Sequence, residues 1–246
     1  MPGLFLTLVI GLIAALFASV GQAGGAGYVG VMGLFGYGTG AIKLTALTLT
    51  VLVSTIGIFG FARAGLVKLR DWYPFALLGV PGAVAGGLIN LPGGWYRGIV
   101  AALLLLAAAR MIFSARGAGA ADQSALAAPP FAPSVLGGGV IGFIAGISGM
   151  GGGIFVVPLV LSLNWAPTRR AAAIAQVNNL YTAAAGLVGV TAAHPAVPPN
   201  LPVWALAAGI GGLLGAWAGA KHLPVTALRY ILAAILIVSG LKLAIG

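Results

Sequence analysis

Residues 146–153 read Gly-Ile-Ser-Gly-Met-Gly-Gly-Gly, and Ile-Phe-Val-Val-Pro follows at 154–158. A glycine in a helix interior costs roughly 1 kcal/mol relative to alanine, so five glycines in eight residues predict that an otherwise apolar helix breaks here. A second such stretch, Gly-Gln-Ala-Gly-Gly-Ala-Gly-Tyr, occupies residues 21–28. Helix breaks at corresponding places in two halves of a chain point to the binding site of a transporter.

The composition is typical of a membrane protein. Hydrophobic residues make up 61% of the 246 residues and charged residues only 6%, against roughly 25% charged in soluble domains. The 12 lysines and arginines outnumber two acids, Asp71 and Asp122, and they lie near the ends of apolar runs instead of forming a patch. We therefore interpret them as topology determinants and expect the lipid bilayer, not nucleic acid, as the partner. Cysteine is absent, which excludes disulfides and thiolate metal sites, and the sequence indicates no cofactor and no metal.

Apolar runs of membrane-spanning length recur along the chain. Seven of them have close to the ~20 residues that cross a bilayer, at 3–20, 44–61, 72–89, 95–113, 171–192, 201–220 and 225–245. Three shorter runs, at 28–37, 135–148 and 154–163, flank the glycine breaks, and we interpret them as half-helices or steeply tilted helices. The sequence predicts an all-α integral membrane protein.

The two halves of the chain are related in sequence. Residues 79–113 align without a gap onto residues 211–245, which places Leu91-Pro92 on Leu223-Pro224 and Arg97 on Arg229. A polar stretch rich in Ala, Gly and Pro separates the halves. We therefore expect a first transmembrane repeat at 1–113, a cytoplasmic linker at 114–133 and a second transmembrane repeat at 134–246.

Basic residues predict that the repeats have opposite orientations. Residues 63–70, after the second helix of the first half, carry three basic residues, whereas the counterpart at 191–201 carries none. If each glycine-broken element crosses the membrane twice or not at all, Arg169 and Arg170 are cytoplasmic; a single crossing would place them outside, which the positive-inside bias disfavours. We predict two inverted-topology repeats, each a glycine-broken helix hairpin followed by three transmembrane helices, with both termini outside.

The chemistry of the breaks favours an anion. A helix that restarts at Gly153 points unpaired backbone N–H groups and a partial positive charge toward the break. A second, facing helix start is expected at residues 25–27, and two such ends would hold an oxyanion without a buried lysine or arginine. The alternative is that the glycines only permit close helix packing, as we expect for Gly82, Gly86, Gly215 and Gly219.

Polar residues within the spans extend the candidate site. Amides and hydroxyls cost a few kcal/mol to bury unpaired, so they must face protein or a wet cavity, either as ligands of the anion or as contacts between helices. The candidate substrate-binding residues are Gln22, Gly24, Gly25, Gly27, Thr50, Gly151, Gly152, Gly153, Gln176, Asn178 and Asn179.

These residues carry a resemblance to a known family. Residues 142–158, with 164–170 and the alanine-rich helix after them, resemble the TauE/SafE family, also called the sulfite exporter or toluenesulfonate uptake permease family. Residues 21–54 resemble a degenerate copy, with Met32-Gly33-Leu34 where the family's proline often follows the glycines. The resemblance implies a multi-pass transporter of the bacterial cytoplasmic (inner) membrane. It implies export or uptake of sulfite, an organosulfonate or a related small sulfur-containing anion, and we predict an exporter that works by alternating access around a midplane site.

The mode of energy coupling follows from the acidic residues. We expect Asp71 and Asp122 in cytoplasmic loops, which leaves no carboxylate within the membrane. Proton- or sodium-coupled carriers usually place one there, so the sequence favours uniport driven by the membrane potential. Whether the protein forms a homodimer is left open.

Two other classes of function compete with a transporter. Gly146-Ile147-Ser148-Gly149 matches the G-x-S-G pattern of an intramembrane serine protease, but that chemistry needs a base, and no predicted span contains a histidine: His194 lies in an outer loop and His222 at a helix end. A membrane assembly subunit that transports nothing would not need polar residues beside two glycine breaks. We therefore predict a transporter and no enzymatic activity.

Overall fold

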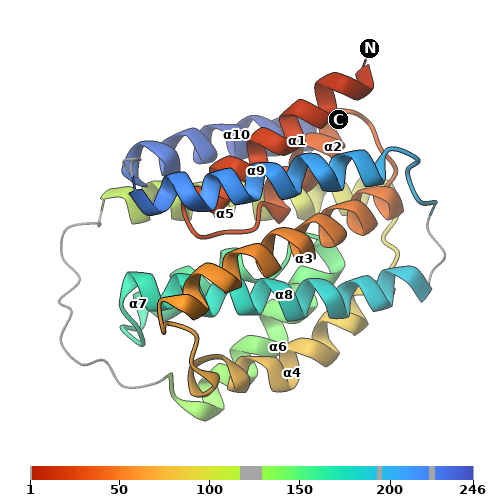
Figure 1. The fold of residues 1–246 in the computed structure, drawn as a ribbon. Coiled ribbons are helices and arrows are strands. Elements are labelled where there is room, and N and C mark those ends of the chain that lie inside the picture. Colours follow the sequence, from red (N-terminus) through yellow and green to blue (C-terminus); the bar gives the residue numbers. More distant parts are fainter. Residues whose placement is uncertain (1, 117–128, 193–195, 222–224, 246) are drawn as a thin grey trace.

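The computed structural model describes residues 2–116, 129–192, 196–221 and 225–245, and every regular element in these ranges is an α-helix, which confirms the predicted all-α class (Figure 1). The helices are α1 (Pro2–Ser19), α2 (Gly25–Leu34), α3 (Thr39–Arg63), α4 (Leu69–Leu88), α5 (Gly93–Arg116), α6 (Phe131–Ser148), α7 (Gly153–Ser162), α8 (Thr168–Ala192), α9 (Leu201–Lys221) and α10 (Val225–Ile245).

Both predicted glycine breaks are present. Gly21 and Gly24 between α1 and α2 have φ angles of 79° and 86°, and Gly149 and Gly151 between α6 and α7 have φ angles of 80° and 76°. Side-chain-bearing residues rarely adopt this left-handed region, so glycine is what allows the chain to turn there. Each break interrupts the helix where the sequence predicted it.

The helices on either side of each break form a hairpin. A β-carbon on Gly27 of α2 would lie 2.9 Å from the ring of Phe17 in α1, and a β-carbon on Gly137 of α6 would lie 3.3 Å from Leu159 of α7. The first helix of each hairpin is full-length, since α1 and α6 have 18 residues each. The prediction of a half-helix at 135–148 is therefore wrong, because α6 begins earlier, at Phe131.

Several helices are long enough to cross a bilayer. Within the described ranges, four meet the combined criteria of length and apolar composition, at Thr39–Arg63, Gly93–Phe113, Phe131–Ser148 and Leu201–Ala218. The second helices of the hairpins, α2 and α7, have only 10 residues each, or about 15 Å of helix. They cover about half of a ~30 Å hydrocarbon core, as half-helices do.

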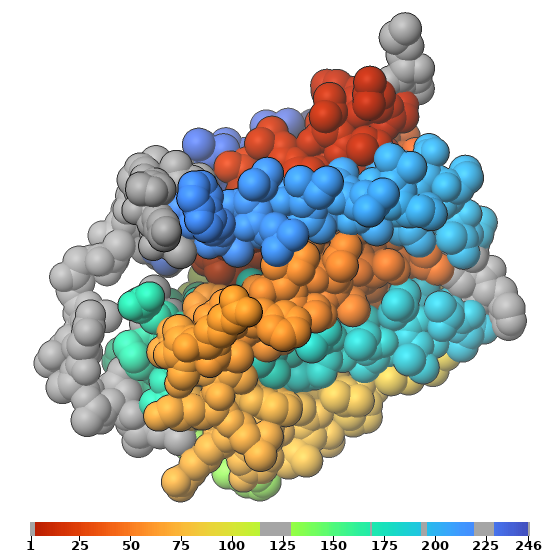
Figure 2. Space-filling model, viewed as in Figure 1, coloured from red at the N-terminus to blue at the C-terminus, as the bar shows by residue number. Residues whose placement is uncertain are grey.

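Helices of the first half pack against helices of the second. The main pairs are α4 with α6, α1 with α9, α5 with α10, α4 with α8 and α3 with α8. In a repeat relation, α1 corresponds to α6 and α4 corresponds to α9. The α1–α9 pair then corresponds to the α6–α4 pair, and both are present. On the face shown in Figure 2, α9 (blue), α3 (orange), α8 (cyan) and α4 (yellow) lie side by side across the molecule. The two halves are thus interleaved.

Small residues bring these helices into backbone contact. A β-carbon on Gly142 would overlap the carbonyl oxygen of Gly79 across the α6–α4 pair, and one on Gly211 would overlap the carbonyl oxygen of Gly11 across the α9–α1 pair. Close approach of this kind is how helices associate where the lipid removes any hydrophobic driving force.

The glycines that the sequence assigned to packing serve this purpose. A β-carbon on Gly82 would lie 2.6 Å from the carbonyl oxygen of Gly139, and β-carbons on Gly86 and Gly215 would overlap backbone carbonyls of α6 and α1. The surroundings of Gly219 lie outside the described residues.

An ion pair joins the two halves at one end of the bundle. Asp71, in the first turn of α4, is 1% exposed, and its carboxylate accepts two hydrogen bonds from the Arg170 guanidinium of α8. The prediction that Asp71 lies in a loop is wrong, because the chain is already helical at Leu69 and the buried carboxylate is stabilised by its partner. Asp122, His194 and His222 lie outside the described residues.

The ion pair also bears on the topology. It places the beginning of α4 and the beginning of α8 at the same end of the bundle. The beginning of α3 and the end of α4 lie at the other end, where Lys43 donates to the carbonyl oxygen of Ile89 (3.0 Å). The start of α1 and the end of α10 also lie together at that other end (Figure 1). This arrangement agrees with the predicted topology in which the α6–α7 hairpin crosses the membrane twice or not at all.

Because the natural chain has no cysteine, single cysteines can test this topology. We expect Ala64→Cys and Leu163→Cys, both exposed, to react with a membrane-impermeant maleimide only from the cytoplasmic side. Gly38→Cys and Asn90→Cys should react only from the outside. Labelling of positions 64 and 163 from opposite sides would contradict the hairpin assignment.

The packing glycines can be tested by their effect on stability. Gly142→Ala should lower the free energy of unfolding by about 1–3 kcal/mol, because the new methyl group meets the backbone of α4. Gly98→Ala is the matched control, since a β-carbon there meets nothing within 4 Å and alanine favours the helix. Thermal unfolding in a neutral detergent measures both, and equal midpoints would contradict the packing role.

Candidate functional site

The starts of α2 and α7 meet beside the middle of α3 and α8. A β-carbon on Gly25, the first residue of α2, would overlap the carbonyl oxygen of Met150 and lie 2.8 Å from the Thr50 hydroxyl oxygen. A β-carbon on Gly151 would lie 2.9 Å from the Asn179 side-chain oxygen and 3.0 Å from the Thr50 methyl carbon. The two breaks, far apart in sequence, are therefore in contact.

Most of the predicted site residues belong to this meeting point, which we call the broken-helix cluster. Its members are Gly24, Gly25, Gly27, Thr50, Gly151, Gly152, Gly153, Asn178 and Asn179, and all of them are buried. Thr50 and Asn179 are each the twelfth residue of a 25-residue helix, so they occupy corresponding positions in α3 and α8.

The start of α7 is capped by side chains of α8. The Gly152 N–H donates to the Thr182 hydroxyl oxygen (3.0 Å), and the Gly153 N–H donates to the Asn179 side-chain oxygen (2.6 Å). Asn179 and Thr182 are three residues apart, which puts them on one face of α8. These two N–H groups, which we predicted to bind a substrate, are thus hydrogen-bonded to side chains of α8 in this structure.

The start of α2 has no such caps. Among the described residues, no acceptor is in hydrogen-bonding geometry to the N–H groups of Gly25, Ala26 and Gly27. The position of α3 that corresponds to Thr182 is Val53, which has no acceptor, and the nearby Thr50 hydroxyl has no partner in this part of the chain. No side chain of the described residues therefore caps the positive end of the α2 dipole, although the Met150 carbonyl oxygen lies beside it.

Other buried polar groups near the cluster also lack partners. Within the described ranges these are the Tyr28 hydroxyl, the Ser54 hydroxyl and the Asn178 side-chain oxygen. A β-carbon on Gly24 would lie 2.9 Å from the Tyr28 hydroxyl oxygen, which places that hydroxyl beside the α2 start. An unpaired buried polar group costs about 1–3 kcal/mol, and such groups in a native fold call for an explanation, such as a ligand.

The two predicted glutamines lie outside the cluster. The side-chain amide of Gln176 packs against Gly57, where a β-carbon would lie 2.6 Å from its nitrogen. Gly57 is seven residues beyond Thr50, or about 10 Å along α3. Gln22 follows Gly21, which packs beside Phe61 still nearer the end of α3. The Gln176 amide therefore lies against α3 at Gly57, and no contact of either glutamine side chain with the meeting helix starts is found among the described residues.

Two polar residues near the second break stabilise helix ends. The Tyr96 hydroxyl donates to the carbonyl oxygen of Ser148 (2.8 Å). The buried Lys43 ammonium donates to the carbonyl oxygens of Ile89 (3.0 Å) and Gly87 (3.3 Å), where it offsets the negative end of α4. Lys43 points away from the broken-helix cluster, although its Cα lies beside Gly149.

Ser148 is placed as a structural residue. Its hydroxyl donates to the carbonyl oxygen of Ile144 (2.6 Å) and accepts from the Met150 N–H (3.3 Å). Neither backbone group can take the proton of a nucleophile, so these contacts do not favour a serine protease.

Thr182 and Tyr28 lie at the site but were not among the residues predicted from the sequence. Thr182 could have been found, because it lies three residues after Asn179 and so shares its helix face. Tyr28 gave no comparable signal, since its hydroxyl becomes relevant only once α2 turns it back toward Gly24.

Comparisons with known proteins agree with this architecture. The sequence model of a family described as "Sulfite exporter TauE/SafE" matches residues 5–243. The chain is also 40% identical over 232 residues to a protein of Sinorhizobium fredii described as "probable membrane transporter protein y4hK", covering 94% of each chain. No solved structure matches.

The cap on α7 gives a test of the site's construction. Thr182→Val removes the acceptor of the Gly152 N–H without changing the size of the side chain, and we expect it to lower the free energy of unfolding by about 1–3 kcal/mol. Thr191→Val is the matched control, because this exposed hydroxyl on the same helix bonds only to carbonyls of its own helix. Equal thermal midpoints for the two variants would show that the cap contributes nothing.

Proposed function

The chain belongs to the sulfite exporter TauE/SafE family of membrane transporters, and from this premise we propose that it exports a small sulfur-containing oxyanion at the broken-helix cluster. Sulfite and organosulfonates are the substrates that we propose, and the bacterial inner membrane is the proposed location. We further propose that the protein catalyses no chemical reaction.

The observation that carries this proposal is the uncapped start of α2. Three buried N–H groups, of Gly25, Ala26 and Gly27, point from a helix start beside the unpaired hydroxyls of Thr50 and Tyr28. All of these groups can donate hydrogen bonds, and a sulfite or sulfonate group offers three oxygen acceptors. A helix start needs no buried cation to attract such a group.

The composition of the cluster also favours anions over zwitterions. None of its members is acidic, and the Asp71 carboxylate is held by Arg170. An ammonium group on the substrate would find no charged partner among the cluster residues. We therefore expect simple sulfonates and sulfite to bind better than an aminosulfonate.

Substrate binding requires the cluster to open. Thr50 and Asn178 are fully buried, and Gly25 touches the carbonyl of Met150. The half-helices are attached to different parts of the bundle, because α2 packs on α10 and α3 whereas α7 packs on α8. We propose that the halves act as inverted repeats and that separating the two helix starts alternately exposes the site to each side.

The driving force that we propose is the membrane potential. An inside-negative potential favours outward movement of an anion by about 2.3 kcal/mol per charge per 100 mV. The ion pair leaves Asp71 no role as a free proton carrier.

The Thr50 hydroxyl provides the test of the site. In proteoliposomes, Thr50→Val should lower the apparent affinity for sulfite by about 10-fold or more, because a hydrogen bond to a charged group is lost. Thr48→Val is the matched control, since the Thr48 hydroxyl donates to the carbonyl of Leu44 in its own helix (2.8 Å). Equal sulfite affinities in the two variants would place the substrate elsewhere.

The driving force can be tested with methanesulfonate, which does not titrate near neutral pH. Efflux from loaded proteoliposomes should accelerate when a potassium diffusion potential makes the interior negative, and should ignore a pH gradient at clamped potential. Efflux that follows the pH gradient would show that uniport is wrong.

A further inference from the structure

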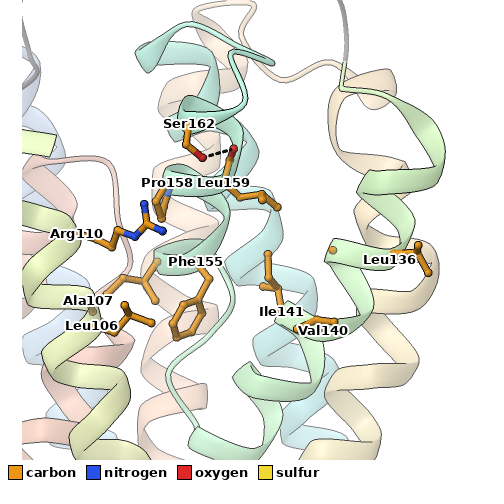
Figure 3. A pocket seen from close by; sticks show the side chains of 12 residues that line it. Leu106, Ala107, Arg110, Leu136, Val140, Ile141, Phe155, Pro158, Leu159 and Ser162 are labelled. Carbon is orange, nitrogen blue, oxygen red and sulfur yellow. Dashed lines mark hydrogen bonds between the residues drawn. The ribbon is translucent and has the colours of Figure 1, made fainter. Parts of the chain in front are cut away.

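A pocket lies between α5, α6 and α7, outside the broken-helix cluster. Its volume is about 410 Å³. Leu106, Ala107 and Arg110 of α5 form one wall, and apolar residues of α6 and α7 form the others (Figure 3). A volume of this size is in the range that holds a small organic ligand.

Arg110 is the charged residue of this pocket. Figure 3 shows its guanidinium directed toward Pro158 of α7, with carbon side chains around it. The Ser162 hydroxyl, also in the lining, donates to the carbonyl of Leu159 in its own helix (3.2 Å). The lining thus combines an apolar surface with a single cation.

The guanidinium has no protein partner in the part of the chain that the structure describes. Arg110 is exposed and lies three residues, or about 4.5 Å of helix, before the end of the apolar span Gly93–Phe113. A guanidinium this near the end of a span can reach the headgroup layer, and its hydrogen bonds to an oxyanion are stronger than those to a neutral group. An unpaired guanidinium beside an apolar pocket therefore favours an anionic partner from outside the chain.

The corresponding interface in the other half is closed. The repeat alignment places Ser239 and Lys242 of α10 on Ala107 and Arg110 of α5. There, α2 packs tightly on α10, since a β-carbon on Gly30 would lie 2.9 Å from Ser239. The equivalent space beside α10 is therefore filled by α2, and the pocket is found only beside α5, α6 and α7 in the part of the chain that the structure describes.

We propose that this pocket binds an amphiphilic anion, with its apolar body between α5, α6 and α7 and its oxyanion group on Arg110. The ligand is either a soluble organic anion or an anionic membrane lipid, which share this chemistry. The lining includes Ile154, next to Gly153 of the broken-helix cluster. A soluble ligand in the pocket thus lies beside the proposed transport site, but its binding there does not depend on that function.

The test uses the full-length protein in nanodiscs of phosphatidylcholine, with titration of methanesulfonate, butanesulfonate and hexanesulfonate by calorimetry. Affinity should rise with chain length, by up to roughly fourfold per buried methylene. Arg110→Gln should weaken hexanesulfonate binding by about 10-fold or more. Ala107→Trp, which fills the pocket, should weaken it as well.

The control is Arg97→Gln, at the other end of α5, where the exposed guanidinium bonds only to the carbonyl of Gly93 (3.3 Å). This variant should bind hexanesulfonate as the natural protein does. Equal affinity in the Arg110→Gln and Arg97→Gln variants, or affinity independent of chain length, would overturn the proposal. Because the readout is binding, a failure of sulfite transport would leave this result interpretable.

Repeating the titration with phosphatidylglycerol in the nanodiscs distinguishes the two ligands. If this lipid weakens hexanesulfonate binding to the natural protein but not to Arg110→Gln, the pocket is a lipid site. If it has no effect while the dependence on Arg110 persists, the ligand is a soluble organic anion.

Discussion

A bilayer supplies no water to the backbone, so every N–H group that a broken helix exposes at membrane depth must find a partner elsewhere. This requirement organises the centre of the molecule. At α7 it is met by Asn179 and Thr182, whose side chains accept from the first N–H groups of the helix. At α2 it is not met by the residues that the structure describes. The difference between these two helix starts makes the cluster asymmetric, and the proposed anion site follows from it.

The remainder of the fold holds these starts in place. Interleaved pairs such as α4 with α6 and α1 with α9 bring backbones into contact through glycine, which fixes the long helices closely. The short half-helices have fewer neighbours in the opposite half. A rigid frame around two short, glycine-flanked segments is what a carrier needs if the segments are to move while the frame stays intact.

The positions of the helix breaks were predictable from the sequence, whereas the contacts between residues on different helices were not. The breaks follow from the intrinsic cost of glycine, so residues 21–24 and 149–152 were found directly. The partner of Asp71 is 99 residues away, and a carboxylate beside three basic residues gives no hint that it is buried. The capping of α7 depends on the rotation of α8 about its axis, which the sequence does not specify. The sequence also does not show that the Gln176 amide packs against Gly57 of α3, because that contact depends on how α3 and α8 cross.

Val53 of α3 occupies the position of Thr182 in α8, and this difference determines which mutations could abolish anion binding. If backbone groups hold the substrate, few side chains can be deleted to abolish recognition. The site is more vulnerable to the arrival of an internal competitor. A hydroxyl at position 53 would resemble the arrangement around α7 and accept hydrogen bonds from the N–H groups at the start of α2. Replacing one methyl group of Val53 by a hydroxyl would therefore let the protein occupy its own anion site.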